Sequence, residues 1–189
     1  SVEKEIEKEL AAITLARRRR KIISVFAKNG LGLLIRDSIT RKLMGKEKRN
    51  QTEREHLRKV GVRLREAFEE LGPTFIKLGQ VLVTRQDLFP EEITLELEKL
   101  LDKVPPIEFS KLQLMIEKEL PEGMDTFEWI DEEPLGSASL GQVYKAKLKD
   151  GPVAAVKIVR PTVEKLFRTD ITVIKKMAGM LRKRLPPEL

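Results

Sequence analysis

The hydrophobic periodicity of this chain changes from helical to strand-like close to residue 121, and this change limits the possible folds more than any other feature. Before it, apolar residues recur every three or four positions in segments that begin near residues 53, 73, 90 and 109, as on one face of an α-helix. After it, residues 127–135, 142–148 and 152–159 have strand-like patterns, and a last helical pattern begins at Pro161. The sequence predicts an α+β fold in which helices precede three antiparallel strands and a final helix.

Three segments follow from this pattern: a basic helical arm over 1–52, a helical region over 53–126, and a strand-rich region over 127–189. The arm should be helical over 3–28 and end in a loop over 45–52. Because the chain opens on Ser1 and stops just after a helical pattern, we expect it to be a piece of a longer protein. Within 109–120, Ser110 and Gln113 have the spacing of a capping box.

The residue composition and the lack of long apolar runs indicate in which cellular compartment the protein is expected. The chain has no cysteine, which excludes disulfides and thiolate metal sites and fits a reducing compartment. The first residues are charged rather than apolar, unlike a signal peptide, and no run approaches the roughly 18 apolar residues that a membrane span needs. We expect a protein on the cytoplasmic side, with at most a peripheral contact to a membrane.

The distribution of charge argues against one class of partner and suggests another. Residues 1–60 carry 17 Lys/Arg against 8 Asp/Glu, whereas residues 91–133 carry 4 against 14. A strongly acidic middle would repel a polyanion, so we do not expect nucleic-acid binding. The arm, with its run of basic residues at 17–21 and apolar residues such as Ile22, Ile23, Val25 and Phe26, either packs on the rest of the protein or lies on a lipid surface.

The small residues of "LGSASLGQVY" at 135–144 suggest close approach of the backbone to a ligand such as phosphate. Gly136 and Gly141 have the glycine spacing of a Walker A loop, but Gln142 and Val143 replace the required lysine and hydroxyl, and a strand follows instead of a helix. "SASLG" approximates a nucleophile elbow, again without a helix, and the only histidine, His56, is far away in the sequence and expected at the surface. Neither a P-loop nor a serine hydrolase fits.

A protein-kinase arrangement fits better. In kinases a glycine-rich loop joins two strands over the nucleotide phosphates, and a third strand carries a V-A-I-K lysine. Here the loop, a strand, an Asp-Gly turn and "VAAVK" occur in that order, with Lys157 standing alone in an apolar strand. A lysine buried in such a strand needs an anionic partner, and the alternative is an edge-strand lysine that reaches water.

The helix predicted over 73–86 has an unusual polar face. Lys77, Gln80 and Thr84 share it, and Gly79 lies between them although glycine costs a helix about 1 kcal/mol relative to alanine. Such a glycine indicates that another backbone or a ligand comes close.

Taken together, "LGPTFIKLGQVLVTRQDLFPEEITLELEKLLDKVPP" and "PLGSASLGQVYKAKLKDGPVAAVKIVRP" resemble the UbiB/AarF family of atypical protein-kinase-like proteins. The resemblance covers roughly residues 55–185. It depends on a K-x-G-Q motif at Lys77, Gly79 and Gln80, and on a loop of small residues at Gly136, Ser137, Ala138 and Ser139. Where the most alanine-rich members carry alanine, this chain has Gly136 and Ser137, so no preference between ATP and ADP is carried over.

The resemblance implies a partial kinase-like N-lobe that binds ATP or ADP with Mg²⁺, in a protein linked to ubiquinone or other isoprenoid-lipid metabolism. Lys157 would be the catalytic nucleotide-binding lysine. The K-x-G-Q helix, with Lys77, Gly79 and Gln80, would cover the active site and restrict its substrates. Quinone-biosynthesis proteins are then possible partners. The residues lining the nucleotide would be Gly136, Ser137, Ala138, Ser139, Gly141, Val143, Ala155 and Lys157.

Several kinase parts are missing from the chain. No catalytic Asp/Asn pair, metal-binding Asp or glutamate partner for the lysine is recognisable, so the metal ligands are expected beyond Leu189 and this chain alone is not expected to be an active enzyme. A pseudokinase scaffold that binds lipid or protein partners without catalysis remains an alternative. For Asp170, we consider an ion pair with Arg85 or Lys77 and a solvated carboxylate to be equally compatible with the sequence.

Overall fold

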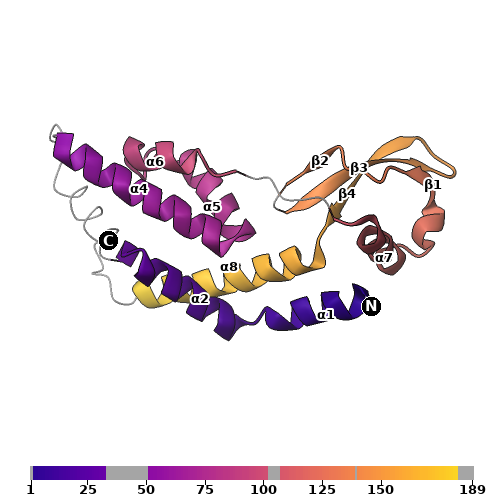
Figure 1. Ribbon diagram of the computed structural model, residues 1–189, viewed down its shortest axis with the longest axis horizontal. Helices are drawn as coiled ribbons and strands as arrows, with labels where there is room; N and C mark the ends of the chain where they lie inside the picture. The colour runs from indigo at the N-terminus through magenta and orange to yellow at the C-terminus, as the bar shows by residue number, and fades with distance from the viewer. Residues whose placement is uncertain (1, 33–50, 102–106, 139, 183–189) are drawn as a thin grey trace. The chain divides into compact units, whose positions relative to one another are not determined.

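A computed structural model describes residues 2–32, 51–101, 107–138 and 140–182, and these form two compact units (Figure 1). The first unit comprises residues 1–13 and 103–168, and the second comprises 14–102 and 169–189. The units do not follow the predicted boundaries at residues 52 and 126, because the arm divides between them and the helix near 109 belongs with the strands. Most of the predicted loop over 45–52 lies outside the described residues.

The second unit is helical. It contains α2 (Leu15–Lys28), α4 (Gln51–Leu71), α5 (Pro73–Val83), α6 (Glu91–Leu97) and the C-terminal part of α8 (Pro161–Arg182). Pro73 begins α5 directly after Gly72, whose φ of 94° is a conformation that favours glycine. The apolar stripes of these helices meet in one core: Ile22, Val25, Leu31, Leu57, Val60, Leu64, Ala67, Phe68, Leu71, Phe75, Ile93, Leu97, Leu100 and Val173.

The arm is not one helix over 3–28. The helix α1 (Val2–Ala12) ends before Thr14, whose side chain caps α2 by accepting a hydrogen bond from the Arg17 amide at 3.3 Å. Ile22 and Val25 are buried in the core of the second unit and Phe26 packs against it, so these three side chains do not insert into a membrane. Among the residues described, no helix is both long enough and apolar enough to span a bilayer.

A buried ion pair joins α2 to α8. Arg18 binds Asp170 through two hydrogen bonds of 2.6 and 2.8 Å, and it donates a third, of 3.0 Å, to the carbonyl oxygen of Leu71. Asp170 is fully buried, so both expectations for it are wrong: it is not solvated, and it pairs with neither Arg85 nor Lys77. Arg85 instead pairs with Asp87 at 2.8 Å. Removing either Arg18 or Asp170 would leave a buried charge without compensation.

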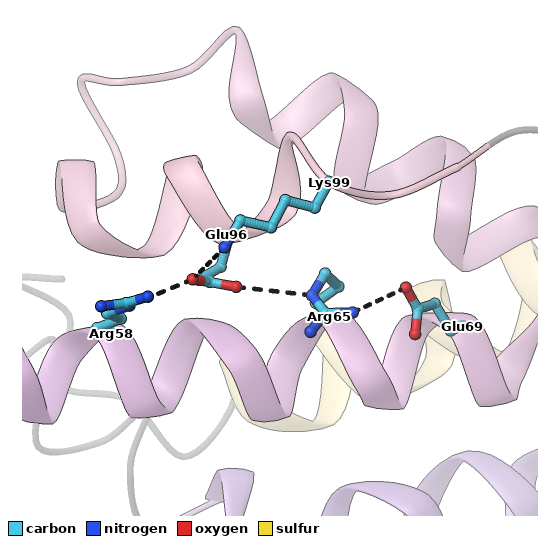
Figure 2. A network of polar contacts seen from close by, with 5 residues as sticks. All are labelled: Arg58, Arg65, Glu69, Glu96 and Lys99. Atoms are coloured by element: carbon cyan, nitrogen blue, oxygen red, sulfur yellow. Dashed lines mark hydrogen bonds and ion pairs between the residues drawn. The ribbon is translucent and has the colours of Figure 1, made fainter.

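A second polar cluster joins α6 to α4 (Figure 2). The carboxylate of Glu96 is almost completely buried and lies among three cations: Lys99 at 2.6 Å, Arg58 at 3.5 Å and Arg65 at 3.6 Å. Arg65 also pairs with Glu69 one helical turn away. Hydrogen bonding to Lys99 is the largest effect on Glu96 and lowers its pKa from the ordinary value of 4.5, whereas its burial acts in the opposite direction.

The first unit contains a small antiparallel sheet. Its strands are β1 (Phe127–Ile130), β2 (Gly136–Ser137), β3 (Gly141–Leu148) and β4 (Val153–Val159). β3 is central: β4 pairs with it along nearly its whole length, and β1 and β2 pair with its two ends. The three predicted strands are therefore present and antiparallel, together with the very short β2. The turn between β3 and β4 falls at the Asp-Gly dipeptide, as predicted.

One face of the sheet packs on α7 (Phe109–Glu119), which Figure 1 shows beside it. The alternation of β3 places fully buried Tyr144 and Ala146 on this inner face, and the shared core comprises Leu112, Met115, Ile116, Phe127, Tyr144, Ala146 and Ile158. The predicted capping box is wrong, because the N-cap of α7 is Glu108 and Ser110 lies within the first turn. Helix α1 contacts this unit through ion pairs of Glu3 with Lys118 (2.7 Å) and Glu5 with Lys111 (3.1 Å).

Candidate functional site

The outer face of the sheet, opposite α7, carries four of the eight predicted nucleotide-binding residues: Gly136, Val143, Ala155 and Lys157. In β4, Val156 and Ile158 pack inward, so Ala155, Lys157 and Val159 face outward. Pairing with β3 brings Lys157 opposite Val143, and Ala155 opposite Lys145. Gly136 of β2 lies opposite Val143 on its other side. One surface therefore combines small apolar side chains with two lysines.

Lys157 is exposed on this surface, so the expectation of a buried lysine is wrong. The reason is that β4 lies at an edge of the described sheet and its outer face is not covered within the first unit. Neither Lys157 nor Lys145 has an ion pair within the described parts of the chain, so both are available to an external anion. Lys157 also borders a groove of about 390 Å³ that is lined by Met115, Leu120, Phe127 and Ile158, but these residues belong to the α7 side of the sheet and not to the outer face.

The loop of small residues is the end of a β-hairpin. The amide of Ala138 donates to the carbonyl oxygen of Gly141 at 2.9 Å, and the amide of Gly141 donates back at 3.2 Å, so two residues separate the last bonded pair. Ser139, one of the predicted site residues, lies outside the described residues. A Cβ added to Gly136 would meet nothing within 4 Å, whereas one added to Gly141 would lie 2.6 Å from the carbonyl oxygen of Ile158. Gly141 therefore allows close packing of β3 against β4.

Two residues near this hairpin face inward. Ser137 lies opposite Gln142 in the β2–β3 register, and its hydroxyl accepts a hydrogen bond of 3.0 Å from the Gln142 amide. Gln142 is fully buried, and its side-chain oxygen accepts from the hydroxyl of Tyr144 at 2.6 Å. Sequence reasoning noticed Gln142 only as the residue that replaces a P-loop lysine. The strand register could have shown that Gln142 and Ser137 face each other.

The K-x-G-Q residues lie on α5 of the other unit. Lys77 is exposed and has no ion pair among the residues that the structure describes, and Gln80 is half-buried. Gly79 is buried, and a Cβ at this position would lie 2.9 Å from Phe68 Cδ2 and closer still to Leu100. The close approach that the glycine indicated is therefore made by two core side chains. Whether α5 covers the nucleotide site stays a prediction.

No group of three or more His, Cys, Asp or Glu side chains suited to a metal ion occurs among the described residues. The outer face of the sheet fits a polyphosphate, since its lysines are exposed, and it offers no cluster of carboxylates for Mg²⁺. The metal ligands remain a prediction for residues beyond Leu189.

A family model for the ABC1 atypical kinase-like domain matches residues 99–189, which include the whole sheet and α8. A "Probable protein kinase UbiB" from Pseudomonas fluorescens is 47% identical over 59% of this chain and 21% of its own length. The chain belongs to the UbiB/AarF family of atypical kinase-like proteins. As a UbiB/AarF chain, it has the α+β organisation expected from its sequence.

Two further relatives are similar to this chain over most of its length. An "Uncharacterized protein in hydrogenase 1 5'region" from Clostridium pasteurianum is 40% identical over 91% of this chain, and a chloroplastic "ACTIVITY OF BC1 COMPLEX KINASE 7" protein from Arabidopsis thaliana is 45% identical over 64%. This UbiB/AarF chain spans 30% of the first protein and 17% of the second. A solved complex of Rv3197 with erythromycin from Mycobacterium tuberculosis matches 80% of this chain and 36% of that one, with 28% identity and a TM-score of 0.41.

Proposed function

We propose that this chain forms the nucleotide-binding part of an atypical kinase-like ATPase or phosphotransferase, which takes ATP or ADP with Mg²⁺. The observation that supports this most directly is the outer face of the sheet. There, Lys157 lies opposite Val143 and two residues from Ala155, so an exposed cation stands beside small apolar side chains. A nucleotide has the matching combination of an apolar base and an anionic phosphate chain.

Lys157 is the residue we assign to the phosphates. An ammonium group without a partner in its own unit contributes a charge-assisted hydrogen bond only when an anion arrives. Val143 and Ala155 would contact the base, since they present small apolar surfaces on adjacent strands of the same face. The backbone of Gly136 and Ala138, both exposed at the hairpin, would line the phosphate side.

The names of the UbiB relatives and the motif resemblance support a role in ubiquinone or other isoprenoid-lipid metabolism, with quinone-biosynthesis proteins as partners. Contact with an anionic membrane surface is part of the same proposal. Arg17, Arg19, Arg20 and Lys21 of α2 are exposed, and Ile23 is 49% exposed beside them. Such a contact would be mainly electrostatic, because the neighbouring apolar side chains are taken up by the core.

The test is nucleotide binding by the full-length protein and its Lys157→Met variant, measured by isothermal titration calorimetry. We expect the variant to bind ATP and ADP at least about tenfold more weakly, because a charge-assisted contact is lost. Lys149→Met is the matched control, since Lys149 lies at the exposed β3–β4 turn, and it should leave the affinity unchanged.

Equal affinities of the Lys157→Met variant and the wild type would contradict the assignment. If that variant also retained biological complementation, the non-catalytic scaffold would be the better account of the family fold in this chain.

A further inference from the structure

We propose that Gln142 is a positioning residue, which holds the β2–β3 hairpin in its nucleotide-binding conformation through Ser137. The inference rests on the proposed function and deepens it. It states that a side chain on the opposite face of the sheet keeps the phosphate-facing hairpin in one conformation. Gln142 faces α7, together with Tyr144, and is fully buried. It therefore does not touch a ligand on the outer face, and any effect on binding passes through the hairpin.

The hydrogen bonds of Gln142 define which way its amide points. The backbone amide of Ile107 donates to the side-chain oxygen at 3.0 Å, and a backbone N–H can only donate, so the oxygen must lie on that side. The hydroxyl of Tyr144 donates to the same oxygen at 2.6 Å. The NH₂ group is then directed at Ser137, whose hydroxyl accepts at 3.0 Å. The Ile107 amide by itself defines the orientation of the Gln142 side chain, so the NH₂ group stays directed at Ser137 when the Tyr144 hydroxyl is removed.

Backbone hydrogen bonds between β2 and β3 and between Ala138 and Gly141 close the hairpin, but few side chains of the described residues pack against it. β2 is two residues long, and its neighbours Gly136 and Ala138 are exposed. A Cβ at Gly136 would meet nothing within 4 Å, so no side chain packs closely there. Apolar burial therefore contributes little to holding these residues, and the half-buried hydrogen bond from Gln142 to Ser137 is a side-chain connection from the core to β2. Losing it should increase the motion of the segment that faces the phosphates.

Two variants separate this positioning role from a general structural one. Ser137→Ala and Tyr144→Phe each remove one hydroxyl that bonds to the Gln142 amide, but only the first hydroxyl lies on β2, beside the hairpin tip. Both should lower the melting temperature of the full-length protein slightly. We expect Ser137→Ala to weaken ATP binding about three- to tenfold, and Tyr144→Phe to change it less than about twofold. Ser137→Thr keeps the hydroxyl and should restore the affinity.

A readout without nucleotide keeps this inference distinguishable from the proposed function. Amide hydrogen exchange at Ala138 and Gly141, measured on the same three variants, reports the hairpin directly. Faster exchange at these two amides in Ser137→Ala alone, with protection regained in Ser137→Thr, supports the inference even if no nucleotide binds to the wild type. Unchanged exchange in Ser137→Ala, or equal changes in Ser137→Ala and Tyr144→Phe, would overturn it.

Discussion

At the scale of single residues, the glycines of the two motifs have different structural reasons. Gly79 lies where Phe68 and Leu100 meet α5, and Gly141 lies against the backbone of Ile158, whereas Gly136 is open to solvent. Only Gly136 is a glycine that a ligand could approach closely. A motif position can therefore be required by packing even when the motif is associated with a binding site.

This difference predicts opposite outcomes for two alanine substitutions. Gly79→Ala would place a methyl group into the core of α5, and we expect a loss of about 1–3 kcal/mol in the free energy of unfolding, as for other overpacked sites. Gly136→Ala should change that free energy by less than about 0.5 kcal/mol, because nothing stands within 4 Å of the added carbon. Urea denaturation of both variants measures the contrast. A fully stable Gly79→Ala protein would show that Phe68 and Leu100 can move aside.

At this scale, the face of the strand on which a side chain lies could be predicted from the sequence. The ion-pair partner of a side chain could not, where that partner comes from a distant segment. The strand predicted over 142–148 is present, and its alternation puts Tyr144 and Ala146 together on one face, which is buried. Asp170 was assigned to two wrong environments, because its partner Arg18 lies 152 positions away within a run of basic residues that reads as a solvated surface. Arg18 shares a helical stripe with Ile22 and Val25, but a basic side chain at such a position does not by itself indicate burial.

At the scale of elements, the helices pair through charge as well as apolar contact. Glu96 of α6 lies among Arg58 and Arg65 of α4 and Lys99, the arrangement drawn in Figure 2. The strands were predictable because the alternation in 142–148, the apolar run at 153–159 and the Asp-Gly turn between them are local signals. The boundary within the arm was not, since a continuous apolar stripe hides the cap at Thr14.

The Glu96 cluster predicts a specific dependence of stability on pH. The pKa of Glu96 is lowered in the folded state. The stabilisation of the folded state by ionised Glu96 is therefore fully present above the ordinary pKa of 4.5, and it is lost as the pH falls through the lower pKa of the folded state. The difference in unfolding free energy between wild type and Glu96→Gln should therefore be large at pH 7 and shrink as the pH is lowered from 5 to 3. Chemical denaturation over this range measures it.

Glu69→Gln provides the control for that series. Glu69 is about 43% exposed and pairs only one turn away with Arg65, so its removal should change stability little at any pH. A difference between wild type and Glu96→Gln that stayed constant down to pH 3 would contradict the role given to the buried carboxylate.

At the scale of the whole molecule, the chain passes between its two units three times, after residues 13, 102 and 168. The α+β class and the family were predictable because periodicity and the two motifs persist over long stretches. The division into units was not, because it depends on which distant segments share a core. Residues 14–28, expected to form part of a separate arm, contribute Ile22 and Val25 to the core of the helical unit.

Two truncations test this assignment. A chain beginning at residue 51 loses Arg18, and the uncompensated Asp170 alone should cost about 3–5 kcal/mol. A chain beginning at residue 14 keeps Arg18 and loses only α1, whose pairs with Lys111 and Lys118 are largely exposed. Thermal melts should therefore show a much larger loss for the first truncation than for the second. Equal melting temperatures would show that α2 is dispensable to the helical unit.

The short tip of the β2–β3 hairpin also limits how this protein could grip a ligand. The amides of Ala138 and Gly141 each donate to the other's carbonyl oxygen, so the bonded part of the hairpin reaches almost to its tip. A nucleotide would rest against this tip rather than be enclosed by it, and its capture rate should depend on diffusion to an open surface rather than on the opening of a gate.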